Sequence, residues 1–264
     1  MIEQFSINIV ACAYPMAEMA VASIRHFYPD VLINVALPEI ERRPFFDKLK
    51  ANVIPNPNRT HHHVILDEMV KRCGTDFFVS CDDDIWMFRN GIVELLDVTL
   101  GKGFFAVGRS QPGNLGCSGK LTMSRLDPAF LTVRTSTFLD KSMTFTRYWS
   151  DDPFEIENKY GVAGDGYYDT GAFIVSDILR HRLKYFDFDY RSHVRHYGSA
   201  SWAILPTLKT PLQVSSMGDV PRLEVEMFDI KRLESSYTNC FSAGHLVSVL
   251  KDIVRDNHAL LDVK

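Results

Sequence analysis

The sequence predicts an α/β fold in which a mostly parallel central sheet is flanked by helices. Two near-continuous apolar runs, residues 6–14 and 77–81, are typical of strands buried on both faces of a parallel sheet. Segments with the period of an amphipathic helix lie between the apolar runs. The length of 264 residues and the hydrophobic content of 46% are enough for a sizeable buried core.

Each element expected in the first half of the chain has a local boundary signal. Pro29 ends the first helix, Pro38 closes the second strand, and Gly74 supplies a left-handed stop after the second helix. A polar, proline-rich connection, residues 54–60, precedes that second helix. The expected order is strand, helix, strand, helix, strand, at residues 6–14, 16–28, 31–39, 61–73 and 77–81.

The second half of the chain is more mixed. Residues 111–120 are rich in Gly, Pro, Asn and Ser and are expected to form a mobile loop. We expect a helix at 91–100, strands at 104–108 and 130–133, and a C-terminal amphipathic helix capped by Ser242. The apolar side of the C-terminal helix consists of Leu246, Val249, Leu250, Ile253 and Val254. Without a repeat or a convincing linker, we expect a single domain, residues 1–264, with parts at 1–100, 101–204 and 205–264.

Composition limits the classes of function. The formal net charge of −4 argues against broad, charge-driven binding of nucleic acid but leaves room for a local basic patch. Five scattered cysteines without a C-x-x-C pair indicate free thiols in a reducing compartment rather than a disulfide framework or a zinc site. The N-terminal residues lack a secretory signal, and no apolar run approaches the length that spans a bilayer. We therefore expect a cytoplasmic protein.

Three consecutive carboxylates, Asp82, Asp83 and Asp84, directly follow the apolar run 77–81. Ligands of parallel sheets bind beyond the carboxyl ends of the strands, and carboxylate oxygens suit Mg²⁺ or Mn²⁺. On an extended chain, Asp82 and Asp84 point to one side and Asp83 to the other. This spacing predicts a divalent cation held by Asp84, with Asp82 on the cation, on a metal-bound water or on a ribose hydroxyl. The alternative is a solvated acidic turn.

Residues 6–88 resemble the nucleotide-sugar-binding half of a GT-A fold glycosyltransferase, of the large family-two type. The stretch INIVACAYP is similar to the opening strand of that family, and DFFVSCDDD is similar to its strand with the D-x-D motif. Pro57-Asn58-Arg59 is loosely similar to the segment with Asn and Arg that leads into a helix in that family. The resemblance implies a Rossmann-like GT-A fold in which residues 1–100 bind the nucleotide sugar. It implies the following nucleotide contacts: Ala11, Tyr14, Arg59, Asp82 and Asp83.

A second match lies downstream, where the family places an acid at a helix start and a His after the next strand. On this match Asp169 is the base that deprotonates the acceptor, and His196 joins Asp82 and Asp84 as a metal ligand or binds the diphosphate. Tyr168 stands where the family usually has Glu, so Asp165 stays open as a substitute base. The alternatives are an N-cap role for Asp169 and a structural role for His196 at a strand end.

These features predict a metal-dependent glycosyltransferase, a hexosyl- or pentosyltransferase, that uses Mn²⁺ or Mg²⁺ and a nucleotide-diphosphate sugar, expected to be UDP-linked. The acceptor is a hydroxyl of a glycan or a small compound. Three alternatives stay open: a viral-type enzyme acting on hydroxymethylated DNA bases, a sugar-nucleotide nucleotidyltransferase, and a non-catalytic GT-A-like binding domain. The segments 111–120 and 205–221 are candidate lids over the donor.

Overall fold

A computed structural model describes residues 4–12, 16–38, 40–58, 60–111, 124–146, 148–150, 166–168, 170–198, 204, 207–209, 222–235 and 243–262. The main sheet has seven strands in the order β12-β6-β9-β4-β1-β2-β3. These strands are β12 (Tyr185–Asp187), β6 (Ala106–Gly108), β9 (Phe130–Arg134), β4 (Phe77–Asp82), β1 (Phe5–Val10), β2 (Leu32–Leu37) and β3 (Asn52–Pro55).

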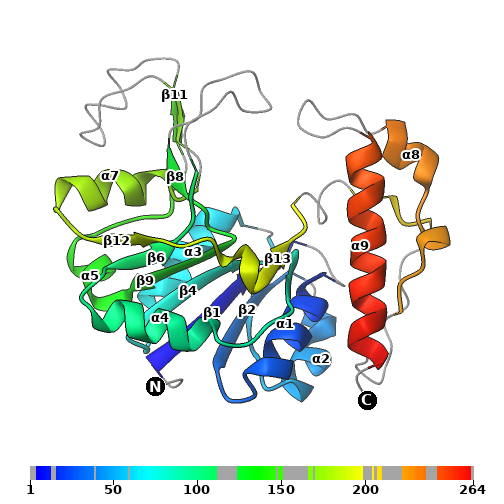
Figure 1. Ribbon diagram of the computed structural model, residues 1–264, viewed down its shortest axis with the longest axis horizontal. Coiled ribbons are helices and arrows are strands. Elements are labelled where there is room, and N and C mark those ends of the chain that lie inside the picture. The colour runs from blue at the N-terminus through cyan, green and yellow to red at the C-terminus, as the bar shows by residue number, and fades with distance from the viewer. Residues whose placement is uncertain are drawn as a thin grey trace. The chain divides into compact units, whose positions relative to one another are not determined.

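The sheet is mostly parallel and is flanked by helices, which confirms the fold class that the sequence predicts (Figure 1). Strand β12 pairs with β6 in parallel, as β2 does with β3, whereas β6 and β9 are antiparallel. Strand β1 is buried along its whole length, as expected of a strand with helices on both faces of its sheet.

The chain divides into two compact units that are interleaved in the sequence. Unit 1 comprises Met1–Ser6, His61–Ser80 and Gly91–Tyr190, and unit 2 comprises Ile7–Thr60, Cys81–Asn90 and Arg191–Lys264. The smaller strands and the helices of unit 1 are α3 (His62–Lys71), α4 (Ile92–Gly101), β7 (Ser110–Gln111), β8 (Arg125–Leu126), α5 (Thr135–Asp140), β10 (Tyr148–Ser150), β11 (Gly166–Tyr168) and α7 (Ala172–Arg180). A short 3₁₀ turn, η3 (Tyr190–Ser192), follows at the boundary with unit 2.

Unit 2 holds the elements from which the candidate site is built. They are α1 (Met16–Phe27), η2 (Ile40–Arg42), α2 (Arg43–Lys48), β5 (Ile85–Met87), β13 (Val194–His196), η6 (Val225–Met227), α8 (Ile230–Ser235) and α9 (Ala243–Asp262). A hydrophobic core joins α1, α8 and α9, and all five residues of the predicted apolar face of α9 are buried in it. The periodicity of the C-terminal segment thus correctly identified which side of α9 packs inward.

The structure also departs from the sequence-based expectations. Asn52–Pro55 forms the edge strand β3, whereas the sequence predicts a connection at residues 54–60. A proline is tolerated in β3 because an edge strand need not donate every hydrogen bond. Most of both predicted lids, and Ser242, lie outside the described residues. Among the helices that the structure describes, none has the length and hydrophobicity needed to cross a lipid bilayer.

Candidate metal centre

The local topology of unit 2 brings a histidine to the acidic triplet. Strand β4 ends at Asp82, and the chain bends at Asp83 and Asp84 before it continues as β5. Strand β13 runs antiparallel to β5 with His196 opposite Ile85. The backbone N–H of Tyr197 extends this pairing by donating to the carbonyl oxygen of Asp84, at 2.9 Å. The histidine, more than 100 positions downstream, is therefore fixed beside the acids by backbone hydrogen bonds.

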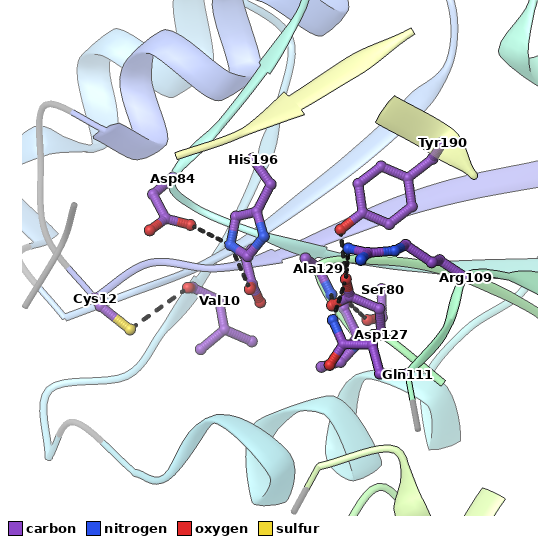
Figure 2. Close-up of polar contacts among 12 residues, drawn as sticks. Val10, Cys12, Ser80, Asp84, Arg109, Gln111, Asp127, Ala129, Tyr190 and His196 are labelled. Carbon is purple, nitrogen blue, oxygen red and sulfur yellow. Dashed lines mark hydrogen bonds and ion pairs between the residues drawn. The ribbon is translucent and has the colours of Figure 1, made fainter. Parts of the chain in front are cut away.

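Three side chains converge at this place. The Nε2 atom of His196 lies 3.1 Å from Oδ1 of Asp84 and 3.4 Å from Oδ2 of Asp82, as Figure 2 shows for Asp84 and His196. The candidate ligand atoms of the three residues all lie within 4.8 Å of one another. Two ligands at right angles on an octahedral cation, each about 2.1 Å from the ion, are about 3 Å apart. The cluster therefore has the spacing and the donor atoms that a divalent cation requires.

The third acid of the triplet has a different environment. The side chain of Asp83 is buried, and its Oδ2 accepts a hydrogen bond from the backbone N–H of Cys12 at 2.7 Å. Cys12 lies just beyond the end of β1, so Asp83 fastens the acidic turn to the neighbouring strand end. The side chain of Asp83 is thus directed to the Cys12 amide and not to His196, although the chain bends here and is not extended as the alternation argument assumes.

The electrostatics of the cluster explain how adjacent acids are tolerated. The side chain of Asp84 is 8% exposed, and those of Asp82 and His196 are each 26% exposed. Burial lowers the pKa of His196, but hydrogen bonds to Asp82 and Asp84 and the charges of these carboxylates outweigh burial and raise that pKa well above its usual value. The imidazolium is therefore the positive partner of the acids when no metal is bound.

A neighbouring thiol, that of Cys81, is kept in its neutral form by burial and by the nearby carboxylates. Cys81 is completely buried in β4, and burial together with the charges of the three aspartates raises the pKa of its thiol well above the ordinary value. A thiol of this kind stays protonated at neutral pH. Cys81 is therefore a packing residue and not a ligand of the cluster.

Of the remaining predicted site residues, only Ala11 lies in the described part of the chain. Ala11 follows β1, and its N–H donates to the carbonyl oxygen of Ala36 at 2.9 Å, so this amide serves the sheet. The following predicted residues lie outside the described part of the chain: Tyr14, Arg59, Asp165 and Asp169. Helix α7 begins at Ala172, close to the start predicted after Asp169.

Unit 1 contains a second polar cluster that the sequence did not indicate (Figure 2). Oδ2 of the buried Asp127 accepts hydrogen bonds from the Tyr190 hydroxyl at 2.7 Å and from Nε2 of Gln111 at 2.8 Å. Oδ1 of Asp127 accepts from the N–H of Ala129 at 3.2 Å, and Nε of Arg125 donates to Oε1 of Gln111 at 2.8 Å. These bonds fasten β7 to β8. The bond from Tyr190 to Asp127 joins residues 63 positions apart, and no short motif marks it.

Comparisons with known proteins give only distant similarities. No family model matches this sequence. No curated protein matches it either. Solved structures that are similar to this chain include glycosyltransferases.

The galactosyltransferase LgtC, solved with donor and acceptor sugar analogues, is 16% identical, with a TM-score of 0.42 over 70% of this chain and 74% of LgtC. TarS of S. aureus is 12% identical, with a TM-score of 0.43 over 94% of this chain; the chain spans 55%, about half, of the TarS structure. CMP:2-keto-3-deoxy-manno-octonic acid synthetase, solved with CTP, is 10% identical, with a TM-score of 0.41 over 70% of this chain and 89% of the synthetase.

Proposed function

We propose that the protein is a metal-dependent GT-A glycosyltransferase that transfers a sugar from a nucleotide-diphosphate donor, with UDP as the nucleotide, to a hydroxyl acceptor. The observation that carries the proposal is the convergence of Asp82, Asp84 and His196 at the end of a buried strand. The family-two resemblance of residues 6–88 also supports the proposal, because its D-x-D motif lies at this same strand end.

The residues of the centre would have different roles in binding a nucleotide-sugar donor. Asp82, Asp84 and His196 would hold the cation, and Asp83 would keep the turn attached to the end of β1 through the Cys12 amide. A mixed set of two carboxylates and one imidazole suits Mn²⁺ better than Mg²⁺, which prefers oxygen ligands. A divalent cation held by these residues would supply positive charge that offsets the negative charge of the departing diphosphate.

Further roles come from the sequence resemblance. Asp169, with Asp165 as the substitute, would take the proton from the acceptor hydroxyl as it attacks the anomeric carbon. Tyr14 and Arg59, with the backbone at Ala11, would contact the nucleotide. The proposed acceptor is a glycan or a small hydroxyl compound, and the proposed location is the cytoplasm.

The test is hydrolysis of a panel of UDP-sugars by wild type and by Asp84→Asn, with Mn²⁺ or with EDTA. The proposal expects hydrolysis that needs Mn²⁺ and is reduced by about 10²-fold or more in the variant, the size typical of losing a group that stabilises developing charge. Glu94→Gln, on the surface helix α4, is the matched control and should hydrolyse at the wild-type rate. Equal, metal-independent rates in wild type and Asp84→Asn would overturn the proposal. Release of pyrophosphate from a nucleoside triphosphate and a sugar phosphate would replace it with nucleotidyl transfer.

A further inference from the structure

The C-terminal helix α9 contacts the strand that carries the candidate metal-ligand histidine. Asp256 of α9 forms an ion pair with Nη1 of Arg195. The same carboxylate oxygen, Oδ2, accepts a hydrogen bond from the Tyr197 hydroxyl at 2.7 Å. Arg195 and Tyr197 are the two residues on either side of His196 in the sequence. One carboxylate oxygen of Asp256 therefore contacts the side chains of both residues that flank His196 in the sequence.

The geometry of a β-strand gives this double contact a directional consequence. Successive side chains of a strand point to opposite faces, so Arg195 and Tyr197 share one face of β13 and His196 projects from the other. Holding both flanking side chains from one side fixes the rotation of the strand about its own axis. That rotation determines where the imidazole of His196 lies relative to Asp82 and Asp84.

The contact is built into the interior of unit 2. The side chain of Asp256 is 9% exposed, and Tyr197 belongs to the hydrophobic core that α9 forms with α1 and α8. Burial, together with the charge of Asp256, raises the pKa of Tyr197, so its hydroxyl remains a donor to the carboxylate at any ordinary pH. The other carboxylate oxygen of Asp256, Oδ1, accepts a hydrogen bond from Nε of Arg255 at 3.1 Å. Removal of either donor to Oδ2 leaves the charge of this largely buried carboxylate less well compensated, so the arrangement is costly to change.

The next two residues of α9 reinforce the attachment. Oδ1 of the fully buried Asn257 accepts the backbone N–H of Leu223 at 2.7 Å, and Nε2 of His258 donates to the carbonyl oxygen of Leu223 at 2.7 Å. The helix thus fastens two separate segments of unit 2 over one turn. This limits how far Asp256 can shift relative to β13.

We propose that Asp256 is a positioning residue for the metal centre: it holds β13 so that the imidazole of His196 faces Asp82 and Asp84. The part of this inference that concerns metal binding rests on the proposed function. The part that concerns the position of β13 does not. Asp256 itself contacts neither the acids nor His196 in any bond described above. It acts through Arg195 and Tyr197.

The experiment compares Asp256→Asn and Tyr197→Phe with wild type, using Mn²⁺ alone as the probe in isothermal titration calorimetry. Loss of a residue that orients a metal ligand typically weakens metal binding 10- to 100-fold, and we expect a weakening of about tenfold. Asp252→Asn is the matched control, because Asp252 lies one turn earlier on α9 and pairs with Arg255, and its replacement leaves the contacts of Asp256 with Arg195, Tyr197 and Arg255 in place. It should bind Mn²⁺ as wild type does. Tyr197→Phe removes one contact without removing the charge, and it serves as the test should Asp256→Asn fail to fold.

A second readout separates this inference from the proposed function. Hydrogen exchange of metal-free protein reports the opening of β13, and the amide of Tyr197, which donates to Asp84, is its most direct probe. We expect this amide to exchange about tenfold faster in both variants and unchanged in Asp252→Asn. Unchanged exchange with unchanged Mn²⁺ affinity in the variants would overturn the positioning role. Failure of wild type to bind Mn²⁺, with faster exchange in the variants, would instead overturn the proposed function and leave the positioning of β13 standing.

Discussion

Replacement of Gly171 by alanine tests the account of how α7 begins. Gly171 is the N-cap of α7 and has a φ of +89°, a conformation that costs an ordinary residue about 1–2 kcal/mol. A Cβ built on Gly171 would lie 2.2 Å from the backbone oxygen of Leu126 in β8, and real Cβ atoms do not approach within 3.0 Å. The backbone at this point is held in place, because the N–H of Leu126 donates to the Gly171 oxygen at 3.5 Å.

Gly103 provides a matched control for the contribution of this contact. It has a nearly equal φ of +84°, but a Cβ there would meet nothing within 4 Å. In both variants alanine restricts the unfolded chain, which offsets about 0.4–1 kcal/mol of the conformational strain. Forcing an atom into the occupied space beside Leu126 adds about 1–3 kcal/mol. We therefore expect a loss of about 0–1.5 kcal/mol for Gly103→Ala and about 1–4.5 kcal/mol for Gly171→Ala, a difference of about 1–3 kcal/mol between the two variants.

Urea unfolding followed by circular dichroism measures the two free energies of unfolding, and calorimetry adds the midpoints. For a chain of this size about 1 kcal/mol corresponds to about 2–4 °C, so the Tm of Gly171→Ala should lie about 2–12 °C below that of Gly103→Ala. Gly103→Ala should lie within about 6 °C of wild type. Equal losses in the two variants would show that the close approach of residue 171 to Leu126 contributes nothing to the loss of stability.

Three further predictions address the centre, the core and a buried acid. Mn²⁺ at 100 times its Kd should stabilise wild type by about 2.7 kcal/mol in thermal unfolding, and Asp84→Asn should lose this gain; stabilisation of both proteins by the same amount would contradict the assignment. Leu250→Ala removes a fully buried side chain from the core of unit 2 and should cost about 2–5 kcal/mol in urea unfolding, whereas Val98→Ala, at a position 59% exposed, should cost little. Burial raises the pKa of Asp67 despite opposing hydrogen bonds from the Phe145 amide and two threonine hydroxyls, so its contribution to stability is fully present below the unfolded pKa and is lost as pH rises through the folded one. Wild type should therefore lose stability relative to Asp67→Asn as pH is raised from about 4; a difference that does not change with pH would show that Asp67 titrates as it does in the unfolded chain.

The elements that could be predicted from the sequence are those with long, regular patterns. The apolar runs of β1 and β4 and the five-residue face of α9 produce strong periodic or continuous signals, and the structure places them as expected. The acidic triplet was located at a strand end for the same reason, because β4 is recognisable as a buried strand.

The features that could not be predicted depend on short elements and on contacts distant in sequence. Strands β5 and β13 have three residues each, too few for a periodic pattern, although their antiparallel pairing is what fixes His196 beside Asp84. The bond from the Cys12 amide to Asp83 involves a backbone donor, which carries no sequence signal. In the sequence, Asp256 cannot be told from the other polar residues of an amphipathic helix. Its partners, Arg195 and Tyr197, lie about 60 positions earlier in the chain.

The most direct test of the central claim is the anomalous diffraction of a crystal soaked with MnCl₂ and UDP. The account predicts a manganese peak about 2.0–2.4 Å from carboxylate oxygens of Asp82 and Asp84 and from Nε2 of His196, with the diphosphate completing the shell. A manganese peak elsewhere, or none at this cluster with UDP bound at another place, would contradict it.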